Sequence, residues 1–400
     1  MRRPNGWKVA LLLACWCVTV PAGAQTAPTE DEVNQAAARL EAELGKYKDA
    51  TPEAAEAMVK LADLYHAHGR VYGLVRVAQQ FVAAHPSDPR HPAVMLKLLD
   101  GLEALSRNKD VAATGRQFLA RYPQAAEGPA VEVRVADASL QIDDRQRAAE
   151  ACAAVWARQG ASPQGRRYGV FAMVQFAATG NGEQMGRGAQ LGDEMLDKLP
   201  AGEFAQHVGW QSFLEWRRIS QWAKANAVGA RLLQKNLAGD PPRRRDLHVL
   251  MAENYANIGQ YANAAEQLRL ARAITDSPYL HLQLITRMYQ AAAKAVELEP
   301  VVNEYVSKHA ARPDRFLAQS YLAHALLRDG DKARAVPLLA SLLPHDAASN
   351  GNASVYVQTA ATDPAQLAAV EATLRAALAA NRDQQAYLRY VLAFEVYRDR

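Results

Sequence analysis

The chain has 400 residues, of which half are hydrophobic, 22% are charged and 7% are aromatic. This composition excludes an intrinsically disordered chain and supplies enough apolar side chains for a large core. With 46 basic against 42 acidic residues, the charge balance gives no sign of a nucleic-acid-binding surface, and we expect no nucleic-acid partner. Such a length suits two or three globular domains, or a repeat array in which each unit packs on its neighbours.

The N-terminus predicts a secretory signal peptide over residues 1–24. Three basic residues precede an apolar run, Val9–Val20, and a small-residue cleavage site ends at Ala24. The run is shorter than the about 20 residues that a membrane-spanning helix needs. We therefore expect cleavage after Ala24 and a periplasmic or secreted protein with 43 basic and 42 acidic residues, because the leader carries three of the 46 basic ones.

A second interpretation of the N-terminus stays open. Leu12-Leu13-Ala14-Cys15 resembles a bacterial lipobox, which would make Cys15 the lipidated first residue of an outer-membrane lipoprotein. The apolar run before Cys15 is very short for that role. We expect attachment to a membrane only if Cys15 is lipidated.

One cysteine, Cys152, follows the predicted leader, since Cys15 and Cys17 lie within it. An intramolecular disulfide is therefore excluded after cleavage, and packing alone must stabilise the protein in an oxidising compartment. Cys152 lies in an alanine-rich apolar run with helical periodicity, so we expect a small buried hydrophobic side chain.

From Asp31 onward nearly every segment has helical periodicity and none shows the alternation of a strand. The spacing of Thr29 and Glu32 predicts a capping box at the start of the first helix, inside an N-terminal helix and linker over 25–52. Turn signals rich in glycine and proline then recur and divide the chain into helices of about a dozen to twenty residues.

A pair of helices is recognisable around Gly259. Ala252 is a small residue where two helices must approach closely, and Tyr255 fills the space one turn later. Gly259 supplies the left-handed end of the first helix, and Ala264 opens the second with another close contact. This pattern resembles the tetratricopeptide repeat (TPR), a family of helix-turn-helix units.

The same offsets recur in two other segments, at Ala62, Tyr65, Gly69, Leu74, Phe81 and Pro86, and at Ala323, Leu326, Gly330, Ala335 and Leu339. Between them, Gly69, Ser106, Asp143 and Gly180 follow one another at intervals of 37 residues, against about 34 in the family. The repeats are therefore divergent. A different superhelical repeat with the same packing stays open.

The resemblance implies an all-α, right-handed α-solenoid or superhelix of helix-turn-helix repeats over 53–345. Helices over 346–400 would cap this array or belong to an incomplete unit. The Phe-x-x-x-Tyr-Pro turn at Phe118–Pro123 is similar to turns of exported TPR proteins of the bacterial envelope-assembly type.

Exposed residues of each first helix line a concave face in the repeats that the chain resembles. We expect a protein or peptide partner to bind this face. The positions that this expectation names are Asp63, His66, Asp100, Glu103, Asp137, Gln141, Glu253, Asn257, His324 and Arg328.

Three tryptophans, Trp210, Trp216 and Trp222, mark one expected helical region at roughly 203–222. Either they fill core between atypical repeats, or Trp210 and Trp216 are aromatic anchors for a partner. A run of three arginines, Arg243–Arg245, begins a further helix, where cations oppose the helix dipole. It is either a solvated cluster or a dock for an acidic partner.

No motif for catalysis, cofactor binding or metal binding is recognisable. A phosphate-binding loop, a dinucleotide fingerprint, His-Glu-x-x-His and Gly-x-Ser-x-Gly are all missing from the sequence. We expect no enzyme activity, cofactor or metal ion, and interpret the chain as an exported scaffold that binds a protein or peptide partner. The alternative is a helical structural region of a larger cell-envelope enzyme or assembly complex. The sequence leaves open which partner binds and whether the chain forms homo-oligomers.

Overall fold

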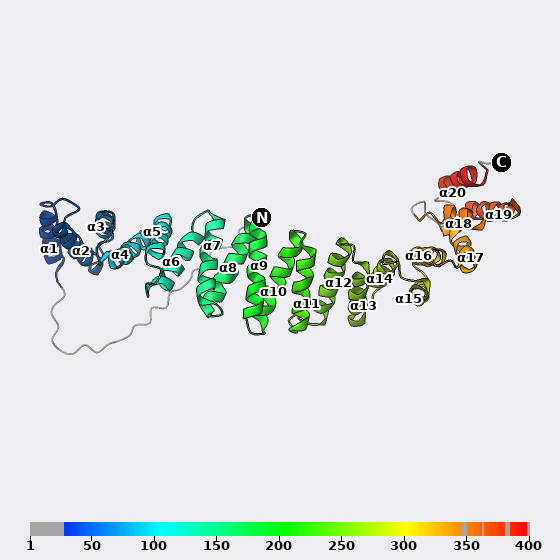
Figure 1. Cartoon of the computed structure of the whole chain (residues 1–400), viewed down its shortest axis with the longest axis horizontal. Helices are drawn as coiled ribbons and strands as arrows, with labels where there is room; N and C mark the ends of the chain where they lie inside the picture. Colours follow the sequence, from blue (N-terminus) through cyan, green and yellow to red (C-terminus); the bar gives the residue numbers. More distant parts are fainter. Residues whose placement is uncertain (1–27, 346–349, 362–363, 381–384, 398–400) are drawn as a thin grey trace. The chain divides into compact units, whose positions relative to one another are not determined.

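The computed structural model describes residues 28–345, 350–361, 364–380 and 385–397. These residues form an all-α protein of tandem helix pairs, the arrangement of an α-solenoid, as the sequence predicts (Figure 1). No strand occurs within the described ranges. The predicted signal peptide and Cys15 lie outside them.

The repeating unit is a pair of helices joined by a short turn. The first helices of the pairs are α2 (Pro52–Ala67), α4 (His91–Ala104), α6 (Gly128–Leu140), α8 (Pro163–Ala178), α10 (Glu203–Arg218), α12 (Pro241–Asn257), α14 (Pro278–Gln290) and α16 (Arg315–Arg328). The second helices are α3 (Val71–Ala84), α5 (Asn108–Arg121), α7 (Arg145–Gln159), α9 (Gly182–Lys198), α11 (Trp222–Gln234), α13 (Tyr261–Ile274), α15 (Ala295–Lys308) and α17 (Lys332–Leu342). Helix α1 (Glu30–Leu44) precedes the pairs, and η1 (Leu343–His345), α18 (Asn352–Ala360), α19 (Pro364–Ala380), α20 (Gln385–Val391) and η2 (Leu392–Val396) follow them.

Short polar residues before proline begin four of the first helices. Thr51, Ser162, Asp240 and Ser277 each accept a hydrogen bond from the backbone N–H three residues later. The proline that follows each cap has no N–H to leave unsatisfied, and its fixed φ suits a first helical residue. The capping box predicted at Thr29 is also present and begins α1.

A single kind of turn ends six of the first helices in the described chain. One residue adopts a positive φ, and the N–H of the next residue donates to the carbonyl five residues before it, as Arg70 does to Tyr65 at 2.8 Å. The six residues with positive φ are Gly69, Ser106, Ser220, Gly259, Ala292 and Gly330. Asp143 falls at the same interval but does not adopt this conformation, because Asp144 caps α7 there instead.

Contacts divide the chain into two compact units, Met1–Val131 and Glu132–Arg400. In the described part of the first unit, the core consists of side chains from the facing sides of successive helices, including Met58, Leu61, Phe81, Leu99 and Phe118. This is the stripe of positions three and four apart that an amphipathic helix buries.

The core of the second unit is continuous along the stack of helix pairs. A first cluster extends from α6 to α12 and contains the buried rings of Trp156, Tyr168 and Phe213. A second extends from α12 to α17 around Tyr305, and a third joins α16 and α17 to the last helices. Figure 1 shows the green and yellow helices of this unit following one another in chain order. Each pair is therefore stabilised chiefly by its neighbours in sequence.

Candidate functional site

The common geometry of the turns defines equivalent positions on the first helices. The residue six positions before each turn is Asp63, Asp100, Asp137, Glu253 or His324 in the repeats where the sequence predicts partner contacts. The same register assigns Val174 to α8, Leu214 to α10 and Thr286 to α14. We call this set the register positions.

The acidic register positions form ion pairs or hydrogen bonds with the neighbouring first helix. Asp63 pairs with Lys97, and His66 Nε2 lies 2.9 Å from Asp100 Oδ2, both between α2 and α4. In the second unit, Arg217 on α10 pairs with Glu253 on α12 at 2.7 Å. These carboxylates hold adjacent repeats together and still have exposed surface. A role in binding a partner stays a prediction for them.

Two further predicted residues belong to an aromatic cluster between α14 and α16. Tyr289 and Tyr321 stack with centroids 4.7 Å apart, and the His324 ring lies 6.4 Å from Tyr289. Arg328 lies over the Tyr289 ring and donates to the Ala293 carbonyl. Burial lowers the pKa of His324, so its imidazole is neutral at physiological pH. The remaining predicted residues are exposed: Glu103 and Asn257 on their helices, and Gln141 in the turn after α6.

The structure corrects the prediction for Trp216. Its side chain is 5% exposed, and its indole N–H donates to Asp193 Oδ2 at 3.1 Å. A partner cannot contact a side chain that is part of the core, so Trp216 is not an anchor. The expected single helix over 203–222 is also wrong, because α10 ends at Arg218 and a left-handed turn at Ser220 separates it from Trp222.

Trp210 lies at the surface of α10 and is half-buried, as an anchor requires. Its ring packs edge-to-face on Phe213 at 5.9 Å, which fixes its orientation. The register positions of α8 and α10 are apolar and exposed, with Val174 at 50% and Leu214 at 43%. Their helices are neighbours, since Arg218 of α10 donates to the Ala177 carbonyl of α8 at 3.5 Å. We call Val174, Trp210 and Leu214 the central apolar positions.

The sequence interpretation misses Val174 and Leu214. A signal for Val174 is present, because Asp63, Asp100, Asp137 and Val174 follow one another at 37-residue intervals. The prediction considered only polar residues on the first helices, so it omitted the apolar Val174 at the same interval. Leu214 is harder to find, because the register lengthens between the turns at Gly180 and Ser220.

A pocket of about 570 Å³ lies beside Trp210, between α10 and α12. Its lining residues are Glu203, Gln206, His207, Trp210, Arg243, Asp246 and Leu250. Gly239 shapes one end of it, with a φ of +93° that an L side chain rarely adopts. A Cβ at this position would lie 2.6 Å from Gln206 Nε2 and 2.9 Å from Arg243 Cδ. The glycine thus lets both side chains approach the loop before α12.

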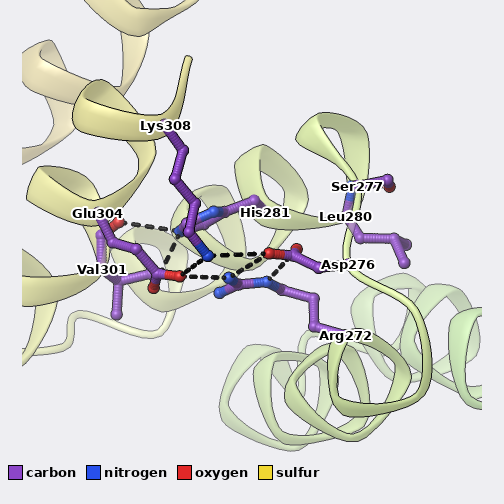
Figure 2. Close-up of polar contacts among 8 residues, drawn as sticks. All are labelled: Arg272, Asp276, Ser277, Leu280, His281, Val301, Glu304 and Lys308. Atoms are coloured by element: carbon purple, nitrogen blue, oxygen red, sulfur yellow. Dashed lines mark hydrogen bonds and ion pairs between the residues drawn. The ribbon is translucent and has the colours of Figure 1, made fainter. Parts of the chain in front are cut away.

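Five ionisable side chains from α13, α14 and α15 and the turn after α13 form a second polar cluster, shown in Figure 2. Arg272 donates to Asp276 Oδ1 at 2.8 Å and to Glu304 Oε1 at 3.2 Å. Lys308 lies 2.7 Å from Glu304 Oε1 and 3.5 Å from Asp276 Oδ2. The Arg272 hydrogen bond lowers the pKa of Asp276 to about 2, and the Lys308 hydrogen bond lowers the pKa of Glu304, so both bridging carboxylates are ionised at neutral pH.

Ligand atoms of Asp276, His281 and Glu304 lie within 4.8 Å of one another, the spacing of a metal site. Two features oppose this use. Arg272 and Lys308 already bind the carboxylate oxygens, and His281 Nε2 lies 3.0 Å from the Val301 carbonyl oxygen. A carbonyl only accepts, so Nε2 carries the proton and has no lone pair for a metal. We infer that the cluster is an ion-pair network that joins three consecutive helices.

No helix among the described residues combines the length and apolar character needed to span a bilayer.

Several solved structures are similar to this chain at low TM-scores. The chain is similar to a tetratricopeptide repeat protein from Parabacteroides merdae, with 10% identity, coverage of 76% of this chain and 98% of the other, and a TM-score of 0.29. It is similar to a structure of Naa15/Naa10 bound to HypK-THB (14% identity, 91% and 66% coverage, TM-score 0.31). A third similar structure is a thermophilic TPR protein of Thermus thermophilus (15% identity, 58% and 98% coverage, TM-score 0.19).

No protein-family model matches the chain, and no curated protein does either. Because the TM-scores are low, the fold assignment depends on the helix pairs, their close-packed alanines and their left-handed turns. Ala252, Ala264 and Ala271 are each at most 2% exposed at the contacts that the repeat pattern requires. The described residues form divergent TPR-like repeats.

Proposed function

We propose that this protein is a non-catalytic scaffold that binds a polypeptide partner through the first helices of its second unit. The observation that carries this proposal is the exposure of Val174 and Leu214 at register positions. Elsewhere the acidic register positions pair with side chains of neighbouring helices, whereas these two apolar side chains face solvent. Exposed apolar side chains on neighbouring helices are typical of a protein-binding surface.

Binding would be concentrated in a few anchors. Trp210 combines a large apolar ring with a fixed orientation, so ordering it on binding costs little entropy. Apolar side chains of a partner would cover Val174 and Leu214. An extended or helical peptide segment can contact register positions on successive first helices at the same time.

A pull-down from cell-envelope extract tests the proposal, with protein that begins at Gln25 and mass spectrometry of what is retained. We expect dominant partners to be lost when Val174→Ser and Leu214→Ser are combined. The matched control is Val296→Ser, because Val296 is 71% exposed on a second helix, away from the register positions. Retention of the same partners by the double variant, or equal loss with the control, would overturn the assignment of this surface.

A second candidate function is a structural role in a larger envelope assembly. Tyr390 and Phe394 stack at 4.6 Å and are 54% and 55% exposed on α20 and η2. Such a pair is suited to packing against another protein. Co-purification with a large complex that is lost on Tyr390→Ser and Phe394→Ser, but kept by the Val174 and Leu214 variant, would favour this role.

We also propose that the protein is exported and cleaved after Ala24. The support is the order of basic, apolar and small residues in the first 24 positions. Intact-mass analysis of protein from the periplasm should give a chain that begins at Gln25. A lipid-modified chain that begins at Cys15 would instead establish the lipoprotein interpretation.

A further inference from the structure

The pocket between α10 and α12 has ionisable walls of opposite sign around an apolar centre. Glu203 lies on the α10 side and Arg243 on the α12 side, while Trp210 and Leu250 supply the apolar surface. Within the described residues the Glu203 and Arg243 side chains form no ion pair with each other or with another residue. The remaining carboxylate of the pocket, Asp246, is bound by Arg245 at 2.6 Å.

Arg243 lies in the first turn of α12, where its backbone N–H donates to the capping side chain of Asp240, and its own side chain is exposed. Its positive charge is available to an anion. Glu203 lies in the first turn of α10, where a carboxylate is favoured, and its charge is available to a cation.

We propose that this pocket binds a peptide segment in which an apolar side chain lies between a basic and an acidic side chain. The apolar side chain would contact Trp210 and Leu250, the basic one Glu203, and the acidic one Arg243. The proposal rests on the proposed function, which it deepens by naming the chemistry of the segment. A volume of about 570 Å³ accommodates one large side chain and its flanking groups.

The direction of the peptide follows from the same charges. Because the two free charges lie on different helices, a segment bound in one direction satisfies both, and the reversed segment meets two like charges. A purely acidic segment would face Glu203, and a purely basic one would face Arg243. A mixed segment of either order can meet both charges by binding in the suitable direction, so the pocket selects a segment that carries one charge of each sign.

Fluorescence anisotropy with labelled nine-residue peptides tests this proposal. The four probes place Lys-Phe-Glu, Glu-Phe-Lys, Lys-Phe-Lys or Glu-Phe-Glu at the centre of a Ser-Gly background. We expect both mixed peptides to bind more tightly than the two like-charged peptides. Glu203→Gln and Arg243→Gln should each weaken them by up to about fivefold, the upper range for an exposed ion pair.

The decisive variant reverses one charge, as Glu203→Lys, and makes both ionisable walls of the pocket basic. It should bind Glu-Phe-Glu most tightly and lose the preference for the mixed peptides. Arg244→Glu and Glu194→Lys are matched controls, since both residues are exposed, carry the same charges and lie outside the pocket. Circular dichroism confirms that each variant keeps its helices.

Equal binding of the mixed and the like-charged peptides, or an unchanged preference in Glu203→Lys, would overturn the proposal. This failure is distinguishable from failure of the proposed function. Loss of a cellular partner on Val174→Ser and Leu214→Ser, together with no preference among the four peptides, keeps the scaffold and removes the pocket. If the peptides show the charge preference but Val174→Ser and Leu214→Ser lose no cellular partner, the pocket proposal is kept and the proposed binding surface is removed.

Discussion

The hydroxyl of Tyr168 on α8 donates a hydrogen bond of 2.6 Å to Asp137 Oδ1 on α6. Tyr168 is 2% exposed, so its hydroxyl has little access to water, and burial together with the Asp137 carboxylate raises its pKa. Asp137 is itself exposed and is a register position. The Asp137 side chain is therefore exposed and also stabilises the contact between α6 and α8.

This relationship predicts that Asp137 contributes to stability. Asp137→Ala would leave a buried hydroxyl without an acceptor, and we expect the free energy of unfolding to fall by about 1–3 kcal/mol. Tyr168→Phe should lower it by a smaller amount, because both the donor and the need for an acceptor disappear. Urea denaturation of the two variants and their combination measures the coupling. If Asp137→Ala unfolds at the same urea concentration as the wild type, the hydrogen bond has no net effect.

The network in Figure 2 predicts unequal roles for its two cations. Arg272 is 13% exposed and binds both carboxylates, so Arg272→Gln should lower the free energy of unfolding by about 1–3 kcal/mol. Lys308 is 51% exposed, and Lys308→Gln should have a much smaller effect. Thermal unfolding of both variants compares them. Equal losses would contradict the central position of Arg272.

The same network predicts behaviour in acid and with metal ions. The pKa of Asp276 is lowered to about 2, so its ionised form stabilises the fold above its unfolded pKa of about 3.9, and this contribution disappears as pH falls toward about 2. Asp276→Asn should reduce that acid dependence. Zn²⁺ should leave the unfolding temperature unchanged, since the carboxylates are already paired. A rise that depends on His281 would establish a metal site.

His281 predicts a further loss of stability in mild acid. Its side chain is fully buried, and burial followed by nearby Arg272 lowers its pKa, while Glu304 and Asp276 act in the opposite direction. As pH falls below about 6.5, the unfolded chain takes up a proton at this residue more readily than the folded chain, so stability decreases there. The urea midpoint should fall less between pH about 7.5 and about 5.5 in His281→Gln. An identical pH dependence would exclude this contribution.

Cys152 should be unreactive until the protein unfolds. Its thiol is fully buried, and burial raises its pKa to about 12, so almost no thiolate forms at neutral pH. We expect reaction with a chromogenic disulfide reagent to be slow in buffer and complete in concentrated guanidinium. Fast reaction of the folded protein would show that the α7 region opens readily.

The sequence predicts the repeat well where the local chemistry is specific. Gly69, Gly259 and Gly330 could be placed at turns because a positive φ favours glycine. Ser220 and Ala292 adopt the same conformation, but nothing in their residue types indicates it, so surrounding packing must impose it. This explains why the end of α10, and with it the separation of Trp216 from Trp222, was not predicted.

The candidate binding surface was less predictable than the fold. Periodicity identifies the helices, but it does not show whether an apolar residue such as Leu214 faces the core or solvent. Burial of Trp216 and exposure of Leu214, two positions apart on α10, depend on how α9 and α12 pack around that helix. The close approach of Gln206 and Arg243, two side chains of the pocket beside Trp210, to Gly239 is a feature that only the structure supplies.

The continuous core from α6 to α12 has a consequence for amide-proton exchange with solvent. Helices in the middle of this cluster have neighbours on both sides, so an opening there breaks two interfaces, whereas the helices after α17 lose fewer contacts. Exchange should therefore be slowest in α8–α11 and fastest in α18–η2. A partner that binds at Val174 and Leu214 would meet the most rigid segment of its unit and need not order it first.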